Sequence, residues 1–128
     1  MTTGLVLPDS AVFDSNILID FLNQRPEARS VIGDVRARYV SVVTRSELLV
    51  GIRDARSRDA AYSLLAMCLM CDVTVAVADH AAALRQEHRL KLPDALIAAT
   101  AVIHRLPLLT RDYVMGTMPN AIVPYRLQ

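Results

Sequence analysis

Residues 11–22 read AVFDSNILIDFL, and this stretch decides the fold. The apolar run at 11–13 is typical of a short buried strand, whereas the apolar residues at 17, 18, 21 and 22 recur with the spacing of one helix face. Asp14 lies where the strand ends and the helix begins, and its carboxylate can cap the first helical turn. The stretch therefore predicts a strand, an acid and a helix in direct succession.

The same alternation continues along the chain. We expect further strands at 39–43, 73–77, 108–110 and 122–123, and helices at 27–35, 44–52, 58–70, 79–89 and 94–105. Strands that alternate with helices predict an α/β fold, with a mostly parallel sheet of about five strands covered by helices on both faces. In such a sheet the strand ends that precede helices lie along one edge, where ligands bind.

The size and composition indicate one globular unit with a partner. The chain has 128 residues, so we expect a single domain over 1–128, with 1–10 as an extended N-terminal segment. Its longest apolar run, 64–71, is far shorter than the roughly 20 residues that cross a membrane. The N-terminus lacks the basic residues of a signal peptide, which predicts a cytoplasmic protein. Apolar residues make up 53% of the chain, more than one small core needs.

The predicted helix 58–70 is a candidate for the partner's contact because it is apolar on two sides. One stripe holds Ala61, Leu64, Leu65 and Cys68, and the other holds Met67, Met70 and Cys71. A helix that is apolar on two sides is buried on two sides, although a loosely patterned core helix explains the pattern equally well. The two cysteines lack further ligands at zinc-binding spacing, so we interpret them as core residues.

Four carboxylates follow the ends of predicted strands or open predicted helices. They are Asp14, Glu47, Asp94 and Asp112. Each has an ordinary structural explanation. Asp14 can cap a helix, and Glu47 can close a capping box that begins at Thr44. Asp94 suits the first turn of a helix and Asp112 suits a turn.

Taken together, the four acids need a cation, because the predicted sheet brings them to one edge. Two carboxylates about 4 Å apart repel each other by roughly 4 kcal/mol in surroundings of intermediate polarity. We do not expect Lys91, the only lysine in the chain, to neutralise them. Hard oxygen ligands select Mg²⁺ or Mn²⁺. Such a cation activates water and stabilises charge on a phosphate, which is what phosphodiester hydrolysis needs.

Four motifs resemble those of the PIN-domain nucleases, in the same order and spacing. They are DSNILID at 14–20, SEL at 46–48, PDALIAATA at 93–101 and LTRD at 109–112. More narrowly, the chain resembles over 12–124 the VapC toxins of bacterial and archaeal toxin–antitoxin pairs. The resemblance implies an endoribonuclease that depends on Mg²⁺ or Mn²⁺. It implies a metal site made by three aspartates, Asp14, Asp94 and Asp112, of which the first two bind directly and the third supports them.

The resemblance also implies roles for neighbouring residues and a set of partners. Glu47 orients or activates water, and Asn16 and Thr110 hydrogen-bond the carboxylates. The implied partners are an RNA substrate, a second copy in a homodimer, and a small cognate VapB-like antitoxin that inserts a segment into the site. Many relatives carry another acid and a phenylalanine soon after T-R-[ND], whereas here Tyr113 follows Asp112. The fourth acid therefore rests on Asp112 alone, and the number of metal ions stays open.

The sequence leaves some other functions open and argues against others. A catalytically silent PIN-fold module that only binds protein or RNA is the main alternative, and a nuclease acting on structured DNA or on an RNA-processing intermediate stays compatible. A receiver-type phosphoacceptor would need a lysine after its last core strand, whereas Lys91 precedes a helix. The four glycines do not form the G-x-G-x-x-G of a dinucleotide site. Arginine makes up 13 of the 14 basic residues, which suits phosphate recognition.

Overall fold

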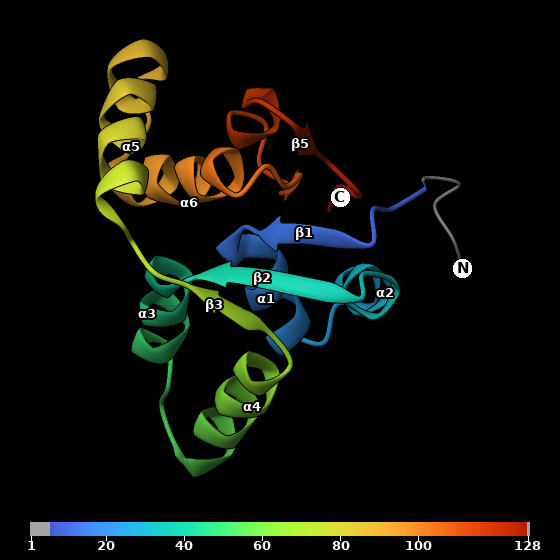
Figure 1. Cartoon of the computed structure of the whole chain (residues 1–128). Helices are drawn as coiled ribbons and strands as arrows, with labels where there is room; N and C mark the ends of the chain where they lie inside the picture. The colour runs from blue at the N-terminus through green and yellow to red at the C-terminus, as the bar shows by residue number, and fades with distance from the viewer. Residues whose placement is uncertain (1–5, 128) are drawn as a thin grey trace.

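The strand predicted at 11–13 is the centre of a parallel sheet (Figure 1). The structure, a computed structural model, describes residues 6–127. In this part of the chain the sheet has five strands in the order β3-β2-β1-β4-β5, and every pair is parallel. The strands are β1 (Ser10–Phe13), β2 (Ala37–Ser41), β3 (Leu69–Cys71), β4 (Leu108–Leu109) and β5 (Ala121–Ile122). The predicted α/β class is confirmed.

Helices cover both faces of the sheet (Figure 1). On one face lie α1 (Ser15–Leu22), α2 (Pro26–Asp34) and α4 (Ala55–Ala66), and on the other lie α5 (Val75–His88) and α6 (Leu92–Ile103). Side chains of a strand alternate between faces. Ala11 and Phe13 of β1 accordingly join the first core, whereas Val12 joins the second.

The topology positions the candidate site at one edge of the sheet. From β1 the chain adds β2 and β3 on one side and β4 and β5 on the other, so the order reverses between β1 and β4. Ligands of parallel sheets bind at such a reversal, beyond the carboxyl ends of the strands. Phe13 is in register with Leu109, and the Asp14 N–H donates to the Leu109 carbonyl at 2.9 Å. Residues 14 and 110 therefore meet at this edge, beside the reversal.

The second strand ends earlier than predicted, which changes the interpretation of Glu47. β2 stops at Ser41, and α3 (Val42–Val50) follows at once. The Ser41 hydroxyl accepts a hydrogen bond of 3.1 Å from the Val43 N–H and caps the helix. The predicted capping box at Thr44 is therefore wrong, because Thr44 lies inside the helix. Glu47 is free of any capping role.

The predicted helix 58–70 and strand 73–77 are also displaced. A capping box of Asp54 and Ser57 starts α4 at Ala55, and the helix ends at Ala66. The third strand is β3, because Leu69–Cys71 pairs with β2 at the sheet edge. Most of the predicted strand 73–77 belongs to α5, which begins at Val75. Thr74 caps this helix, because its hydroxyl accepts a hydrogen bond from the Val77 N–H.

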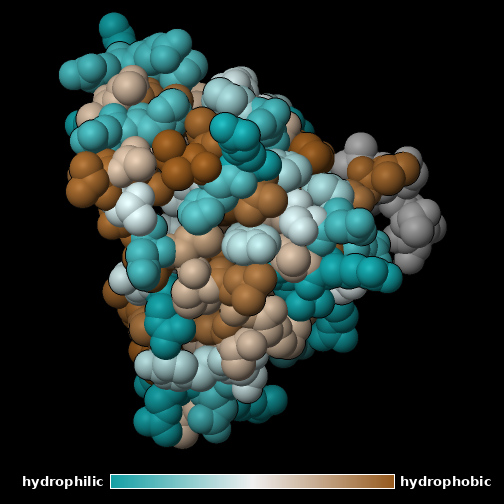
Figure 2. Space-filling model, viewed as in Figure 1, coloured by the Kyte–Doolittle hydropathy of each residue, from teal (hydrophilic) through white to brown (hydrophobic). Residues whose placement is uncertain are grey.

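The second apolar stripe of the predicted helix consequently does not exist. Met70 and Cys71 belong to β3, and Met67 is the C-cap residue that directly follows α4. Apolar side chains instead reach the surface along the edge strand and at the start of α5. These exposed residues are Leu69, Met70, Val73 and Val75. On the face shown in Figure 2, apolar groups are interspersed with polar ones.

The remaining segments agree with the predictions more closely. α5 and α6 form a helical hairpin whose turn includes Arg89 in the left-handed region, at φ 57°.

Cys71 is buried and Cys68 is half-buried, and burial raises the pKa of the Cys68 thiol to about 11. Leu7 packs on the first core, and 1–5 of the predicted N-terminal segment lie outside the described residues. No helix within 6–127 is long and apolar enough to cross a membrane.

Candidate active site

Asp14 is the buried centre of the candidate site. It lies between β1 and α1, and only 5% of it is exposed. Its Oδ1 accepts a hydrogen bond of 2.7 Å from the Ser15 N–H. Its Oδ2 accepts bonds of 2.7 Å from the Thr110 hydroxyl and 3.3 Å from the Asn16 amide. The carboxylate is thus both the predicted N-cap of α1 and the centre of a network that joins β1 to β4.

The surroundings of Asp14 oppose its negative charge. Burial raises the pKa of Asp14 to about 6, and the nearby charges of Asp94 and Asp112 add to the increase. The hydrogen bonds from Thr110 and Ser15 lower the pKa but do not cancel the effect of burial. Among the described residues, the ion pairs are those of Asp20 with Arg111 and of Glu87 with His88. Asp14 is therefore left without a cationic partner in the described part of the chain.

Glu47 is held over the same edge by a serine that the sequence analysis did not single out. Glu47 is exposed on α3, and its Oε1 accepts a bond of 2.6 Å from the Ser15 hydroxyl. The buried Thr44 hydroxyl lies 3.0 Å from the Ser15 Oγ. The D-S-N motif places Ser15 directly after Asp14, so the sequence indicated that Ser15 lies near the site. Its partner, Glu47, is set only by the packing of α1 against α3.

Asp94 approaches from the helical hairpin on the other face of the sheet. It lies in the first turn of α6 and is partly exposed. Burial raises the pKa of Asp94, and the charges of Glu47 and Asp112 raise it further. Lys91 acts in the opposite direction and has the smallest effect of the four. Lys91 is thus near enough to lower the pKa of Asp94, but it does not neutralise the acids, because the pKa of Asp94 stays raised.

Asp112 combines a turn role with membership of the acidic cluster. It follows β4, and its N–H donates to the Thr110 hydroxyl oxygen at 3.1 Å. Its Oδ2 accepts from the Met115 N–H at 3.3 Å, where the short 3-10 helix η1 (Met115–Thr117) begins. The structure therefore brings all four predicted acids to one edge of the sheet, with Asn16 and Thr110 between them.

A second buried network fixes the loop that carries Asp112. The Asp20 carboxylate on α1 is buried and pairs with the Arg111 guanidinium, with 3.0 Å between Oδ1 and Nη2. The buried Tyr125 hydroxyl donates to Asp20 Oδ2 at 2.7 Å. The hydrogen bonds that Arg111 donates to Asp20 raise the pKa of the Arg111 guanidinium. The arginine of the T-R-D motif is thus occupied within the fold.

The donor set fits a hydrated hard cation better than an ion enclosed by protein. Within 6–127, no group of three or more His, Cys, Asp or Glu side chains is arranged to hold a metal by itself. Mg²⁺ commonly keeps several waters and takes only one or two carboxylates from the protein. A carboxylate has about four acceptor positions, and the three donors around Asp14 leave room for one further ligand contact. Asp14 and Asp94, whose charges repel, are the residues present that suit such an ion.

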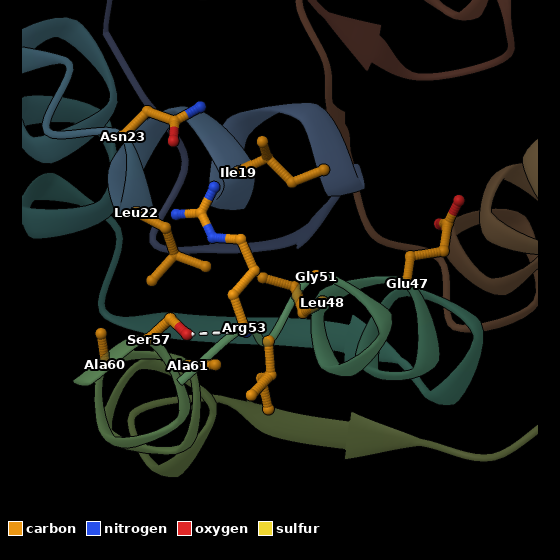
Figure 3. Close-up of a pocket in the computed structure, with 11 residues that line it drawn as sticks. Ile19, Leu22, Asn23, Glu47, Leu48, Gly51, Arg53, Ser57, Ala60 and Ala61 are labelled. Carbon is orange, nitrogen blue, oxygen red and sulfur yellow. Dashed lines mark hydrogen bonds between the residues drawn. The ribbon is translucent and has the colours of Figure 1, made fainter. Parts of the chain in front are cut away.

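A pocket lies between α1, α3 and α4, and one of the four acids, Glu47, lines it. Its lining also includes Ile19 and Leu22 of α1, Leu48 of α3 and Ala61 of α4. Figure 3 shows the Arg53 side chain extending from the α3–α4 connection towards α1. The pocket thus joins an apolar floor to one of the acids.

Comparisons with known proteins agree with this architecture. The model of the PIN domain family matches residues 11–119. A chain from a toxin–antitoxin complex of Klebsiella pneumoniae is 36% identical, with a TM-score of 0.85 over 92% of this chain and 100% of that one. A chain from VapBC2 of Rickettsia felis, bound to a promoter DNA fragment, is 18% identical, with a TM-score of 0.73 over 88% and 95%. A chain from FitAcB of Neisseria gonorrhoeae is 20% identical, with a TM-score of 0.72 over 91% and 99%. No curated protein matches.

Proposed function

This chain belongs to the PIN domain family, and we propose that it is a metal-dependent endoribonuclease that hydrolyses phosphodiester bonds of RNA. One observation carries the proposal above the others. Asp14 is buried beside Asp94 and Asp112, its pKa is raised to about 6, and no described residue pairs with it as a cation. Burying a carboxylate among like charges costs free energy unless a cation binds there.

The residues of the site divide into three roles. Asp14 and Asp94 hold Mg²⁺ or Mn²⁺, and Asp112 supports them. When bound, the ion supplies positive charge beside the phosphate and makes a water molecule more acidic. Glu47 accepts the proton of the attacking water, because its exposed carboxylate faces the same edge and Ser15 fixes one of its oxygens. Thr110 and Asn16 orient the Asp14 carboxylate through its Oδ2.

The test compares the parent chain with Asp94→Asn on labelled single-stranded RNA, in Mg²⁺, in Mn²⁺ and in EDTA. We expect cleavage that needs the metal and that Asp94→Asn abolishes, while thermal unfolding shows the variant to be folded. Asp79→Asn is the matched control, because it neutralises an exposed aspartate of α5 and should cut at the parental rate. An Asp94→Asn variant that cuts as well as the parent, or a parent that is inert with both metals while pure on a gel, would contradict the proposal.

The comparison with a solved complex supports a place in a toxin–antitoxin pair. The chain that is 36% identical comes from a toxin–antitoxin complex. We propose that this chain is the VapC-type toxin of such a pair and acts as a homodimer. In the cognate antitoxin, one segment covers the pocket beside Glu47, whose apolar floor suits an apolar helix face and whose acid suits a basic side chain.

Growth and oligomeric state test this second part. Induced expression of the parent should arrest bacterial growth, whereas Asp94→Asn should not, although both accumulate equally. Light scattering of the purified chain should give the mass of two copies. Growth arrest by Asp94→Asn would contradict a toxin that acts by cleavage, and a monomeric mass would contradict the homodimer.

A further inference from the structure

Tyr113 and Arg126 form an exposed stack that the proposed chemistry does not use. Tyr113 directly follows Asp112, and with 70% of it exposed it is the most exposed aromatic residue within 6–127. The Arg126 guanidinium carbon lies 3.5 Å from the centre of the Tyr113 ring. A guanidinium over the face of a tyrosine ring is a favourable arrangement, so the two side chains stabilise each other at the surface.

Two sets of contacts fix the stack relative to the acids. Asp112 bonds the N–H groups of Met115 and Gly116 through its side chain and its carbonyl, at 3.3 Å and 2.8 Å, and so shapes the turn that presents Tyr113. Arg126 Nη1 donates to the Arg111 carbonyl oxygen at 3.4 Å, so the guanidinium lies against the backbone next to Asp112. The stack therefore has a defined place beside the candidate metal site.

The charges of the site explain why a substrate would need such a stack. Four carboxylates repel an RNA backbone, and Arg111, which directly precedes Asp112, is paired with Asp20. Arg126 makes no ion pair among residues 6–127. Single-stranded RNA is commonly held by bases stacked on aromatic rings and guanidinium planes, because every base has a flat π face.

We propose that Tyr113 and Arg126 bind one unpaired nucleobase of the RNA next to the scissile phosphate. The inference rests on the proposed function, since it takes RNA as the ligand. The base stacks on the exposed surface of the pair, and the guanidinium adds positive charge where the acids lack it. Stacking of this kind accepts any base, so it positions the strand with little preference for sequence.

The test is binding and photo-crosslinking of a single-stranded RNA oligonucleotide that carries 5-iodouridine at successive positions, using the uncleaving Asp94→Asn background. We expect one labelled position to crosslink to Tyr113, identified by mass spectrometry. Tyr113→Ala should weaken binding about tenfold, which corresponds to about 1.4 kcal/mol for one stacked base. Tyr113→Phe should bind as the parent does, because it keeps the ring, and Arg126→Ala should bind more weakly.

Tyr62→Ala is the matched control, because Tyr62 is 45% exposed and also lies under an arginine, Arg45, at 5.6 Å. It should bind RNA as the parent does. Parental binding by Tyr113→Ala, or crosslinks that map away from Tyr113, would overturn the inference even if the parent cuts RNA. Tyr113-dependent binding by a parent that never cuts would instead overturn the hydrolytic function and leave the base site standing. Absence of RNA binding by every variant would overturn both.

Discussion

The hydroxyl of Thr110 donates a hydrogen bond of 2.7 Å to Oδ2 of Asp14, across 96 positions of sequence. This bond ties the ends of the two strands between which the order of the sheet reverses. It also lowers the pKa of Asp14 against the effect of burial. Thr110 itself is fully buried and, through the same oxygen, accepts the N–H of Asp112. One hydroxyl thus orients two of the four acids.

Thr110→Val keeps the shape of the side chain and removes both of these bonds. We expect RNA cleavage to fall about 10–100-fold, as for other residues that orient metal ligands. The pH below which cleavage declines should also move upward, because Asp14 loses the hydrogen bond that lowers its pKa. Thr110→Ser keeps the hydroxyl and should retain the parental pH profile. A pH profile of Thr110→Val that matches the parent would show that the bond does not orient Asp14.

Ser15→Ala should separate the positioning of Glu47 from the binding of metal. Its hydroxyl donates to Glu47 at 2.6 Å, while the bond to Asp14 comes from the backbone N–H and survives the substitution. We expect the catalytic rate to fall at saturating Mg²⁺, with the Mg²⁺ concentration for half-maximal activity unchanged. Ser46→Ala, at an exposed position one residue before Glu47, is the control. A shift in the Mg²⁺ requirement without a loss of rate would contradict this role.

The raised pKa of Asp14 predicts how stability depends on pH. Its ordinary value is 3.8 and its folded value is about 6, so the folded state binds the proton more tightly. The stability that this proton contributes is fully present below pH 3.8 and is lost as the pH rises through about 6. In EDTA, therefore, the Tm of the parent should fall relative to that of Asp14→Asn between pH 4 and pH 7.5.

Mg²⁺ should reverse that loss only where Asp14 is ionised. Protons compete with the metal for the carboxylate, and a ligand of the folded state raises Tm by mass action. We expect a larger Mg²⁺-induced rise in Tm at pH 7.5 than at pH 5, and no such rise for Asp14→Asn. Scanning calorimetry of both chains measures it, and an equal rise at both pH values would place the metal elsewhere.

The buried network behind the site should matter for folding more than for chemistry. Arg111→Met leaves the Asp20 carboxylate buried without its partner, which should cost about 3 kcal/mol of unfolding free energy. Tyr125→Phe removes only one of the hydrogen bonds that Asp20 accepts and should cost about 1.5 kcal/mol of unfolding free energy. Arg36→Met, at an exposed position, is the control. Urea unfolding at pH 7 gives the three values. An Arg111→Met chain as stable as the control would show that the ion pair contributes nothing.

Part of this molecule could be predicted from local patterns. The apolar run at 11–13, the acid after it and the helix spacing that follows are all local, and the structure confirms each. Because the strands are parallel, their carboxyl ends share an edge, and the four acids could be expected there before their contacts were known. The family resemblance agrees with the PIN domain match over 11–119.

Other parts were decided only by tertiary contacts. The last residues of the predicted helix 58–70 belong instead to β3. Their pairing with β2 at Tyr39, Val40 and Ser41 outweighs a weak local preference for helix. The bond from Ser15 to Glu47 spans 32 positions, and the pairing of Asp20 with Arg111 spans 91. A sequence gives the spacing of residues along one element, whereas these partners depend on how separate elements pack. Local patterns thus determined which acids lie at this edge of the sheet, and the tertiary structure decided what holds each of them there.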